Sequence, residues 1–194
     1  MIRVYFVRHA QPEHGWEDDR TRPLTLQGME DSKQVIEFFQ SMDIDRFYCS
    51  PYKRSIDTIA ATAKSHKKEI ITKEGLRERE GGVGGYLPGM IEKRWADFSY
   101  HEEGGESIGM VQNRNMEAFR AILKECEEAE TGKDMSIVIG THGTALSSIL
   151  QYYDDTYNCD SFFRIKNWMP FIMELDIQDG ECVGRKEHLY LERV

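Results

Sequence analysis

An arginine and a histidine stand side by side at positions 8 and 9, directly after a run of apolar residues. Residues 2–7 are rich in β-branched and aromatic side chains, which predicts a short strand of a buried parallel sheet. In α/β proteins, ligands bind outside the carboxyl ends of such strands. The Arg8 guanidinium fits phosphate or carboxylate, and the His9 imidazole can attack an electrophile or move a proton near neutral pH. A solvated Arg-His turn is the ordinary alternative, and the rest of the chain decides between the two.

A second histidine follows another predicted strand. Residues 135–140 form the clearest buried strand of the sequence, which ends in Thr141-His142-Gly143 before a helix over 145–150. The carboxyl ends of parallel strands lie on one side of a sheet. His142 is therefore expected to face the same pocket as His9.

Arg54 lies near the end of a third predicted strand, over residues 45–49. Ser50-Pro51 predicts a helix start directly after that strand, with Ser50 as N-cap and Pro51 in the first helical position. Arg54 then falls in the first helical turn, where the helix dipole disfavours a cation by roughly a few tenths of a kcal/mol. A phosphate bound at the helix N-terminus would account for this placement. The ordinary alternative is that the Arg54 side chain points into solvent and binds no phosphate.

The remaining segments alternate between predicted helices and strands. Helices are expected over 26–41 with Thr25 as N-cap, over 90–100 and over 108–130, and strands over 69–72, 171–177 and 183–191, the last two as a hairpin through Asp179-Gly180. This alternation predicts one α/β domain over residues 1–194 with a mostly parallel central sheet. The segments 81–107 and 152–168 interrupt the alternation and are expected to lie over the end that carries the site.

Composition narrows the possible functions. The formal net charge of −9 argues against a nucleic-acid binder, but permits a small anionic ligand where cations gather locally. The sequence has no apolar run long enough to predict a membrane span. The N-terminal run is a predicted strand rather than a signal peptide, and the cysteines form no Cys-x-x-Cys, so we expect a cytoplasmic protein without disulfides or a metal cluster.

Five short motifs occur in an order that resembles the histidine phosphatase superfamily, in the branch of cofactor-dependent phosphoglycerate mutases and small-molecule phosphatases. They are Arg8-His9-Ala10, Ser50-Pro51-x-x-Arg54-x-x-x-Thr58, Leu76-x-Glu78 before a glycine run, Gly105-Glu106-Ser107 and Thr141-His142-Gly143. The resemblance implies a three-layer α/β/α sandwich of the phosphoglycerate mutase-like type. It also implies a phosphatase that needs neither metal nor cofactor, acting on a small phosphomonoester.

The resemblance assigns a role to each matched residue. His9 would be the nucleophile that takes the phosphoryl group, and Glu78 would protonate the leaving oxygen and later activate water. Arg8, Arg54 and His142 as an imidazolium would hold the phosphate oxygens, because phosphoryl transfer needs mainly positioning and charge stabilisation. The expected substrate-binding set comprises Arg8, Gln11, Arg54, His142 and Gly143.

The chain departs from the family pattern after His9. The family often has Arg-His-Gly-Glu-Thr-x-x-Asn, whereas this loop has Pro12 in place of the hydroxyl residue and Gly15 in place of the asparagine. Gln11 is expected to supply a substitute amide donor. A zinc site that includes His9 and His14 is disfavoured, because their spacing of five differs from the i, i+4 pair of helical zinc sites.

Two alternatives remain open for the function and one for the acid. Glu80 competes with Glu78, but the position relative to Leu76 favours Glu78. A phosphoglycerate mutase and a non-catalytic phospholigand-binding module share the expected fold. A nucleophile together with an acid favours an enzyme, and the short glycine-rich cover over 81–107 favours hydrolysis, because such a cover closes poorly against water. Its single basic pair, Lys93-Arg94, lies on a predicted helix, where facing solvent is the ordinary role.

Overall fold

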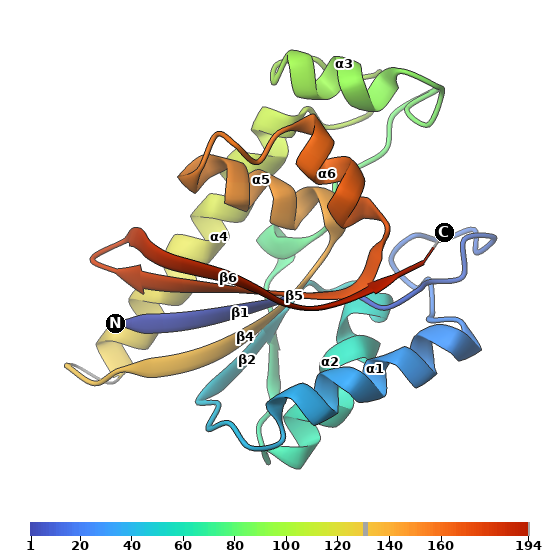
Figure 1. The fold of residues 1–194 in the computed structure, drawn as a ribbon. Helices are drawn as coiled ribbons and strands as arrows, with labels where there is room; N and C mark the ends of the chain where they lie inside the picture. The colour runs from blue at the N-terminus through green and yellow to red at the C-terminus, as the bar shows by residue number, and fades with distance from the viewer. Residues whose placement is uncertain (130–131, 194) are drawn as a thin grey trace.

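A six-stranded sheet forms the centre of the molecule in the computed structural model, which describes residues 1–129 and 132–193 (Figure 1). The strand order is β3-β2-β4-β1-β5-β6. The bounds are Ile2–Arg8 for β1, Arg46–Cys49 for β2, Ile70–Thr72 for β3, Met135–Thr141 for β4, Trp168–Gln178 for β5 and Glu181–Glu192 for β6. The pairs among β1 to β4 are parallel, and β5 runs antiparallel to both β1 and β6. The prediction of a mostly parallel sheet is confirmed.

Helices cover both faces of this sheet. They are α1 (Leu26–Phe39), α2 (Lys53–Ser65), α3 (Met90–Ala96), α4 (Ile108–Ala129), α5 (Gly143–Tyr153) and α6 (Cys159–Lys166), with a short 3-10 helix over Glu74–Leu76. Helices α1 and α2 pack on one face, where Val35 and Ile59 join the apolar core with Val138. Helices α4 and α5 pack on the other, around Phe6 and Phe119. The expected three-layer α/β/α sandwich is therefore confirmed.

The start of α1 braces the loop that follows β1. Thr25 caps the helix as predicted, because its side-chain oxygen accepts from the Gly28 backbone N–H at 2.9 Å. Gly28 lies so close to the loop that a Cβ there would stand 2.2 Å from the Gln11 carbonyl oxygen. Only glycine permits this approach. Met29 is spaced to share the apolar face with Val35 and Phe39, but it is 50% exposed.

The start of α2 also differs from the prediction. The helix begins at Lys53 with Tyr52 as N-cap and without a side-chain cap, two residues later than the predicted first position at Pro51. Ser50 is instead fully buried, and its hydroxyl contacts His142. Arg54 nevertheless falls in the first turn as expected. The hydroxyl has thus found a tertiary partner instead of a helix to cap.

The predicted C-terminal hairpin is confirmed. Strands β5 and β6 pair antiparallel, and the turn residues Asp179 and Gly180 both have positive φ, at 53° and 82°. Turns with two positive φ values match the twist of the flanking strands. None of the helices within residues 1–129 and 132–193 combines the length and apolarity that crossing a bilayer requires.

The two expected insertions meet above the sheet. Helix α3, from 81–107, and helix α6, from 152–168, lie on the same side of the molecule as α5 (Figure 1). Trp95 of α3 and Phe162 of α6 pack in one small apolar cluster with Ile108 at the start of α4. This cluster attaches the cover to the layer of α4 and α5.

Candidate active site

A cavity of about 720 Å³ lies at the carboxyl end of β1. Arg8 and His9, from the end of β1, form part of its wall, together with Arg54 of α2, Glu78, and Gly143 at the start of α5. His142 is fully buried behind this wall, and its ring centroid lies 5.3 Å from that of His9. The structure therefore brings together the predicted residues of four separate segments.

The His9 ring is held so that one nitrogen remains available. Its Nδ1 lies 2.8 Å from the Ala10 carbonyl oxygen. A carbonyl only accepts hydrogen bonds, so we assign the ring proton to Nδ1 and the free lone pair to Nε2. Burial first, and then the charges of Arg54 and Arg8, hold the pKa of His9 well below its ordinary 6.5. A neutral imidazole with a free Nε2 is the form that can act as a nucleophile.

The loop after His9 is fixed by its backbone. The His9 N–H donates to the Thr141 carbonyl oxygen at 3.1 Å, which joins the ends of the neighbouring strands β1 and β4. The Ala10 N–H donates to the Thr58 hydroxyl of α2 at 2.9 Å. Three elements thus set the direction of the His9 side chain.

His142 differs from the expected imidazolium. Burial first, and then the charges of Arg54, His9 and Arg8, hold its pKa well below 6.5, so the ring is neutral in the free protein. Its Nε2 lies 2.7 Å from the Ser50 hydroxyl, which also accepts from the Tyr52 backbone N–H. Ser50 can therefore donate to Nε2 and leave the proton on Nδ1, an atom that is buried without a partner in the described part of the chain. This Nδ1 is shielded from the cavity in the free protein, because His142 is not among the residues that line it.

Arg8 is anchored at the base of the cavity. One Nη donates to the Trp168 carbonyl oxygen at 2.6 Å and also to that of Ile165, at the junction of α6 and β5. Burial lowers the pKa of Arg8 to about 10, so the guanidinium is still charged at neutral pH. A Cβ on Gly143 would lie 3.3 Å from the Arg8 Nε, so the position next to this guanidinium has little room for a side chain.

Arg54 has a partner that the sequence did not reveal. Its Nη1 donates to the Asp19 backbone carbonyl at 2.6 Å and to the Asp19 carboxylate at 3.2 Å, while the guanidinium stacks over the Tyr52 ring at 5.0 Å. Asp19 also pairs with Arg22 at 3.1 Å. In the free protein, Asp19 of loop 13–22 thus accepts hydrogen bonds from the guanidinium that was expected to hold phosphate.

Glu78 is fastened to the start of α5. One carboxylate oxygen accepts from the backbone N–H groups of Arg79 at 2.8 Å and Ala145 at 3.1 Å, and the other accepts from Thr144 at 3.0 Å. These donors hold the carboxyl group beside Gly143 in the cavity wall. The side chain of Glu80, by contrast, is 59% exposed and pairs with Arg77 at 3.6 Å.

Gln11 lies away from this set. Its side-chain oxygen accepts from the Thr25 hydroxyl at 3.0 Å, and Gln11 is absent from the cavity wall. His14 does line the cavity. Among the described residues, no three His, Cys, Asp or Glu side chains are arranged to hold a metal ion.

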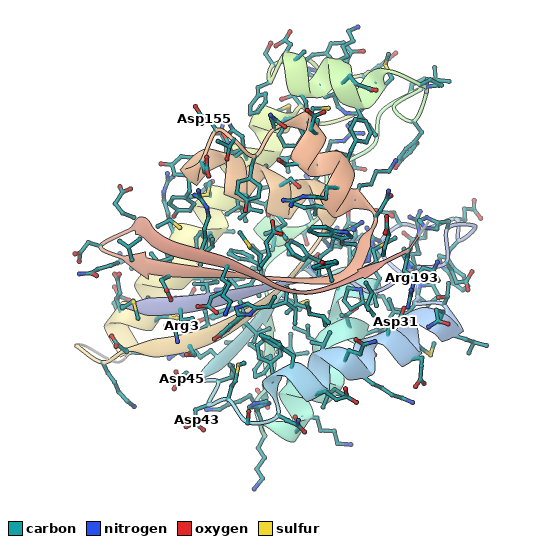
Figure 2. The ribbon with its side chains drawn as sticks, viewed as in Figure 1. Arg3, Asp31, Asp43, Asp45, Asp155 and Arg193 are labelled. Atoms are coloured by element: carbon teal, nitrogen blue, oxygen red, sulfur yellow. The ribbon has the colours of Figure 1, made fainter. Side chains whose placement is uncertain are left out.

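Several further residues line the cavity although the sequence did not place them there. Phe162, Phe163 and Lys166 reach the cavity from α6, and Arg79 and Arg94 reach it from the segment before α4. Arg193 contributes at the rim, where its guanidinium binds the Asp31 carboxylate at 2.7 and 2.8 Å (Figure 2). The three residues of α6 and Arg94 lie in segments that interrupt the helix and strand alternation, whereas Arg79 and Arg193 lie outside them. Arg94 was noted in the sequence only as part of a basic pair.

We expect both active-site imidazoles to resist protonation. Because burial and neighbouring cations lower the pKa of His9 and His142, the free protein should keep both rings neutral as the pH falls through 6.5. NMR titration of the imidazole Cε1–H signals, assigned with His9→Gln, measures this without a titrating substrate. A midpoint near 6.5 for His9 would contradict the assignment of a neutral nucleophile.

The same shifts predict how stability depends on pH. A histidine whose folded-state pKa is depressed destabilises the fold once the unfolded chain takes up a proton that the native state refuses. The free energy of unfolding should therefore fall as the pH drops below about 6.5. Denaturant melts of His9→Gln at pH 5 and pH 8 should show a smaller loss than the parent protein.

Comparison with known proteins places this arrangement in a family. The pattern of the histidine phosphatase superfamily (branch 1) matches residues 4–186. A 2,3-bisphosphoglycerate-dependent phosphoglycerate mutase of Thermoplasma acidophilum is 26% identical over 160 residues, which cover 79% of this chain and 75% of the relative.

Two solved structures share the fold. A mycobacterial glucosyl-3-phosphoglycerate phosphatase superposes with a TM-score of 0.72 at 14% identity, covering 97% of both chains. A phosphoserine phosphatase variant of Entamoeba histolytica, in complex with phosphoserine, superposes with a TM-score of 0.71 at 17% identity, covering 98% of this chain and 96% of the other. With a family pattern that spans nearly the whole sequence, this chain belongs to branch 1 of the histidine phosphatase superfamily.

Proposed function

We propose that the protein is a metal-independent phosphatase that hydrolyses small phosphomonoesters through a phosphohistidine on His9. The observation that carries this proposal is the His9 ring, which is neutral, bound through Nδ1 to the Ala10 carbonyl, and exposed through its cavity face to a ligand. A ligand-binding module would need the surrounding cations but no oriented nucleophile. The cavity of about 720 Å³ suits a small molecule.

The proposed reaction has two steps. In the first, Nε2 of His9 attacks phosphorus, the ester P–O bond breaks, and Glu78 gives its proton to the departing oxygen. In the second, water attacks the phosphohistidine, Glu78 takes a proton from it, and the N–P bond breaks to release phosphate. Arg8 and Arg54 compensate the phosphate charge in both steps. The Nδ1–H of His142, which is buried in the free protein, is proposed to donate to a phosphate oxygen once the ligand is bound.

The relatives support hydrolysis of small substrates. The mycobacterial and Entamoeba proteins are both phosphatases, of glucosyl-3-phosphoglycerate and of phosphoserine. We further propose that residues 1–194 act as one domain, with 81–107 and 152–168 as a cover over the site. The four cysteines are free thiols, which fits a reducing cytoplasm.

A screen of phosphomonoesters tests the proposal most directly. Purified protein should release orthophosphate from 4-nitrophenyl phosphate and from a subset of sugar, amino-acid and glycerol phosphates. Absence of phosphate release across a chemically broad panel, together with tight binding of the same compounds, would favour the binding module.

Chelation should leave the rate unchanged. The positive charge around the phosphate comes from Arg8 and Arg54, so the reaction as proposed has no step that requires a divalent cation. We expect the same kcat/KM for 4-nitrophenyl phosphate with and without excess EDTA. Loss of activity that is restored by Mg²⁺, Mn²⁺ or Zn²⁺ would overturn the metal-independent mechanism.

Phosphoglycerate mutase activity is the second candidate, and one observation favours it. Arg94 is buried instead of facing solvent, and it shares the Glu102 carboxylate with Arg79. Both arginines line the cavity, so two guanidiniums divide one carboxylate there and leave positive charge that a substrate carboxylate could use. The Thermoplasma relative is itself a phosphoglycerate mutase.

We nevertheless expect hydrolysis to prevail. A mutase must keep its phosphohistidine from water, whereas here Tyr86 and Leu87 line the cavity and are 88% and 63% exposed. On 3-phosphoglycerate with 2,3-bisphosphoglycerate, phosphate release should equal or exceed formation of 2-phosphoglycerate. If conversion greatly outran release, the mutase assignment would be correct.

A further inference from the structure

The segment that carries Glu78 is held by neither helix nor strand. The 3-10 helix ends at Leu76, and residues 77–80 have no regular secondary structure. The Glu78 carboxyl group nevertheless meets three backbone N–H groups, two of them at the start of α5. Something other than a helix or a strand must therefore fix the backbone of this segment.

Glu106 brackets Glu78 from both sides. Its carboxylate accepts from both Nη atoms of Arg77 at 2.7 and 3.0 Å, and from the Glu80 backbone N–H at 2.9 Å. Its own backbone N–H donates to the Glu80 carbonyl at 3.1 Å. Glu106 belongs to the Gly105-Glu106-Ser107 motif, to which the proposed reaction assigns no role.

Arg114 of α4 completes the arrangement. Its Nε and Nη2 bind the two Glu106 carboxylate oxygens at 3.0 and 2.8 Å. Its Nη1 donates to the carbonyls of Gly75 at 2.8 Å and Arg77 at 2.9 Å, and its Nη2 lies 3.4 Å from the Glu78 carbonyl. A single guanidinium thus contacts the backbone that precedes the acid, the carbonyl of the acid itself and the carboxylate that brackets it.

The Glu106 carboxylate remains ionised at neutral pH. Burial of Glu106 opposes its ionisation, but the hydrogen bonds from Arg114 and Arg77 prevail and lower its pKa to about 2. Glu106 is only 8% exposed, so removal of one partner would leave a charge in poor contact with water. The group behaves as a unit in which each member depends on the others.

We infer that Glu106 and Arg114 are positioning residues. They fix the backbone of residues 75–80 and so hold the Glu78 carboxyl group in place. This inference rests on the proposed function, in which Glu78 is the general acid and base. A purely structural role would stabilise the fold and lower all rates alike. A positioning role lowers most the rate that depends most on proton donation by Glu78.

The leaving group separates these two roles. An alkyl phosphate such as 2-glycerol phosphate needs a proton on its departing oxygen, whereas 4-nitrophenyl phosphate releases a stable anion. Arg114→Met should therefore reduce kcat/KM for 2-glycerol phosphate at least about 10-fold more than for 4-nitrophenyl phosphate, part of the roughly 10²–10⁴-fold that general acids supply. Arg120→Met is the matched control, because Arg120 lies on the same helix, exposed and bound to Tyr152. It should change neither rate.

A double-mutant cycle with Glu78→Gln gives the sharper test. If Arg114 acts through Glu78, Arg114→Met should cost little on 2-glycerol phosphate once Glu78 is already glutamine. An undiminished loss in the Glu78→Gln background, or equal losses on both substrates, would overturn the inference. Should Arg114→Met fail to fold by circular dichroism, Glu106→Gln, which keeps the side-chain size, decides by the same comparison.

Failure of the proposed function has a different signature. If Glu78→Gln itself affects both substrates equally, Glu78 is not the acid, and the premise fails before the clamp is tested. If Glu78→Gln is selective for the alkyl phosphate while Arg114→Met and Glu106→Gln are unselective, the premise stands and the positioning inference alone is wrong.

Discussion

A His9→Ala variant is expected to lose at least about 10⁴-fold in kcat on 4-nitrophenyl phosphate, because it removes the atom that forms the covalent intermediate. Arg8 and Arg54 would still bind the phosphate group, so KM should change far less than kcat. His142 cannot replace the nucleophile, since it is fully buried and its Nε2 is bound to Ser50. His101→Ala, at an exposed position, is the control and should keep the parent rate.

The intermediate itself should be detectable. Rapid quenching of the parent protein during turnover, followed by peptide mass spectrometry under conditions that preserve acid-labile phosphate, should place a phosphoryl group on His9. The His9→Ala variant should show none at any histidine. Substantial turnover by His9→Ala, or a phosphoryl group on another residue of the parent protein, would refute the proposed nucleophile.

Glu78→Gln is expected to have the next largest effect, and a selective one. Glutamine keeps the size of the side chain but can neither give nor take the proton, so alkyl phosphates should lose roughly 10²–10⁴-fold in kcat/KM. Aryl phosphates should lose much less in the first step, because their leaving groups need little protonation. The measurement compares kcat/KM for hydrolysis of an alkyl and an aryl phosphate by the parent protein and by the variant.

Glu80→Gln provides the matched control for that experiment. It lies two residues away in the same segment, is largely exposed and is absent from the cavity wall. Its rates should remain within about two-fold of the parent on both substrate classes, as expected for a solvated surface charge. A larger and more selective loss at Glu80 than at Glu78 would reverse the assignment of the acid.

The meeting of His9 and His142 was predictable because it depends on local signals. Each follows a short, continuously apolar strand, and parallel strands end on the same side of a sheet. The pairing of β1 with β4 in the register Arg8 to Thr141 then sets both histidines at one height. The approximate limits of most strands and helices could be read in the same way, but helix α6 was not predicted and α3 ends at Ala96 rather than at residue 100.

Contacts between distant segments were not predictable from local signals. Ser50 before a proline has every property of an N-cap, yet its hydroxyl contacts His142, 92 residues away. Asp19 lies in a polar loop with nothing to mark it as a partner of Arg54, 35 residues away. Secondary-structure propensity reflects interactions with residues that are near in the chain. Ser50 and Arg54 instead bind partners that only the tertiary structure brings close.

The clamp on Glu78 shows an intermediate case. The Gly105-Glu106-Ser107 motif could be recognised in the sequence, but its role depends on Arg77 and Arg114, which lie 29 residues before Glu106 and eight after it. A sequence motif indicates that a residue is important, but it does not show which groups the side chain binds. The purpose of this glutamate follows only from the folded arrangement.

The contact of Asp19 with Arg54 would affect how tightly the proposed phosphatase binds any phosphate. The Asp19 oxygens accept from the same guanidinium that is proposed to bind a phosphate oxygen, so an entering phosphate would compete with Asp19 for part of that guanidinium. That cost falls equally on substrate, product and transition state, and therefore raises KM and product Ki together without slowing the chemical step. The ratio of KM to product Ki would then stay the same, so the Asp19 side chain would shift the phosphate concentrations at which the proposed phosphatase works without changing its preference between substrate and product.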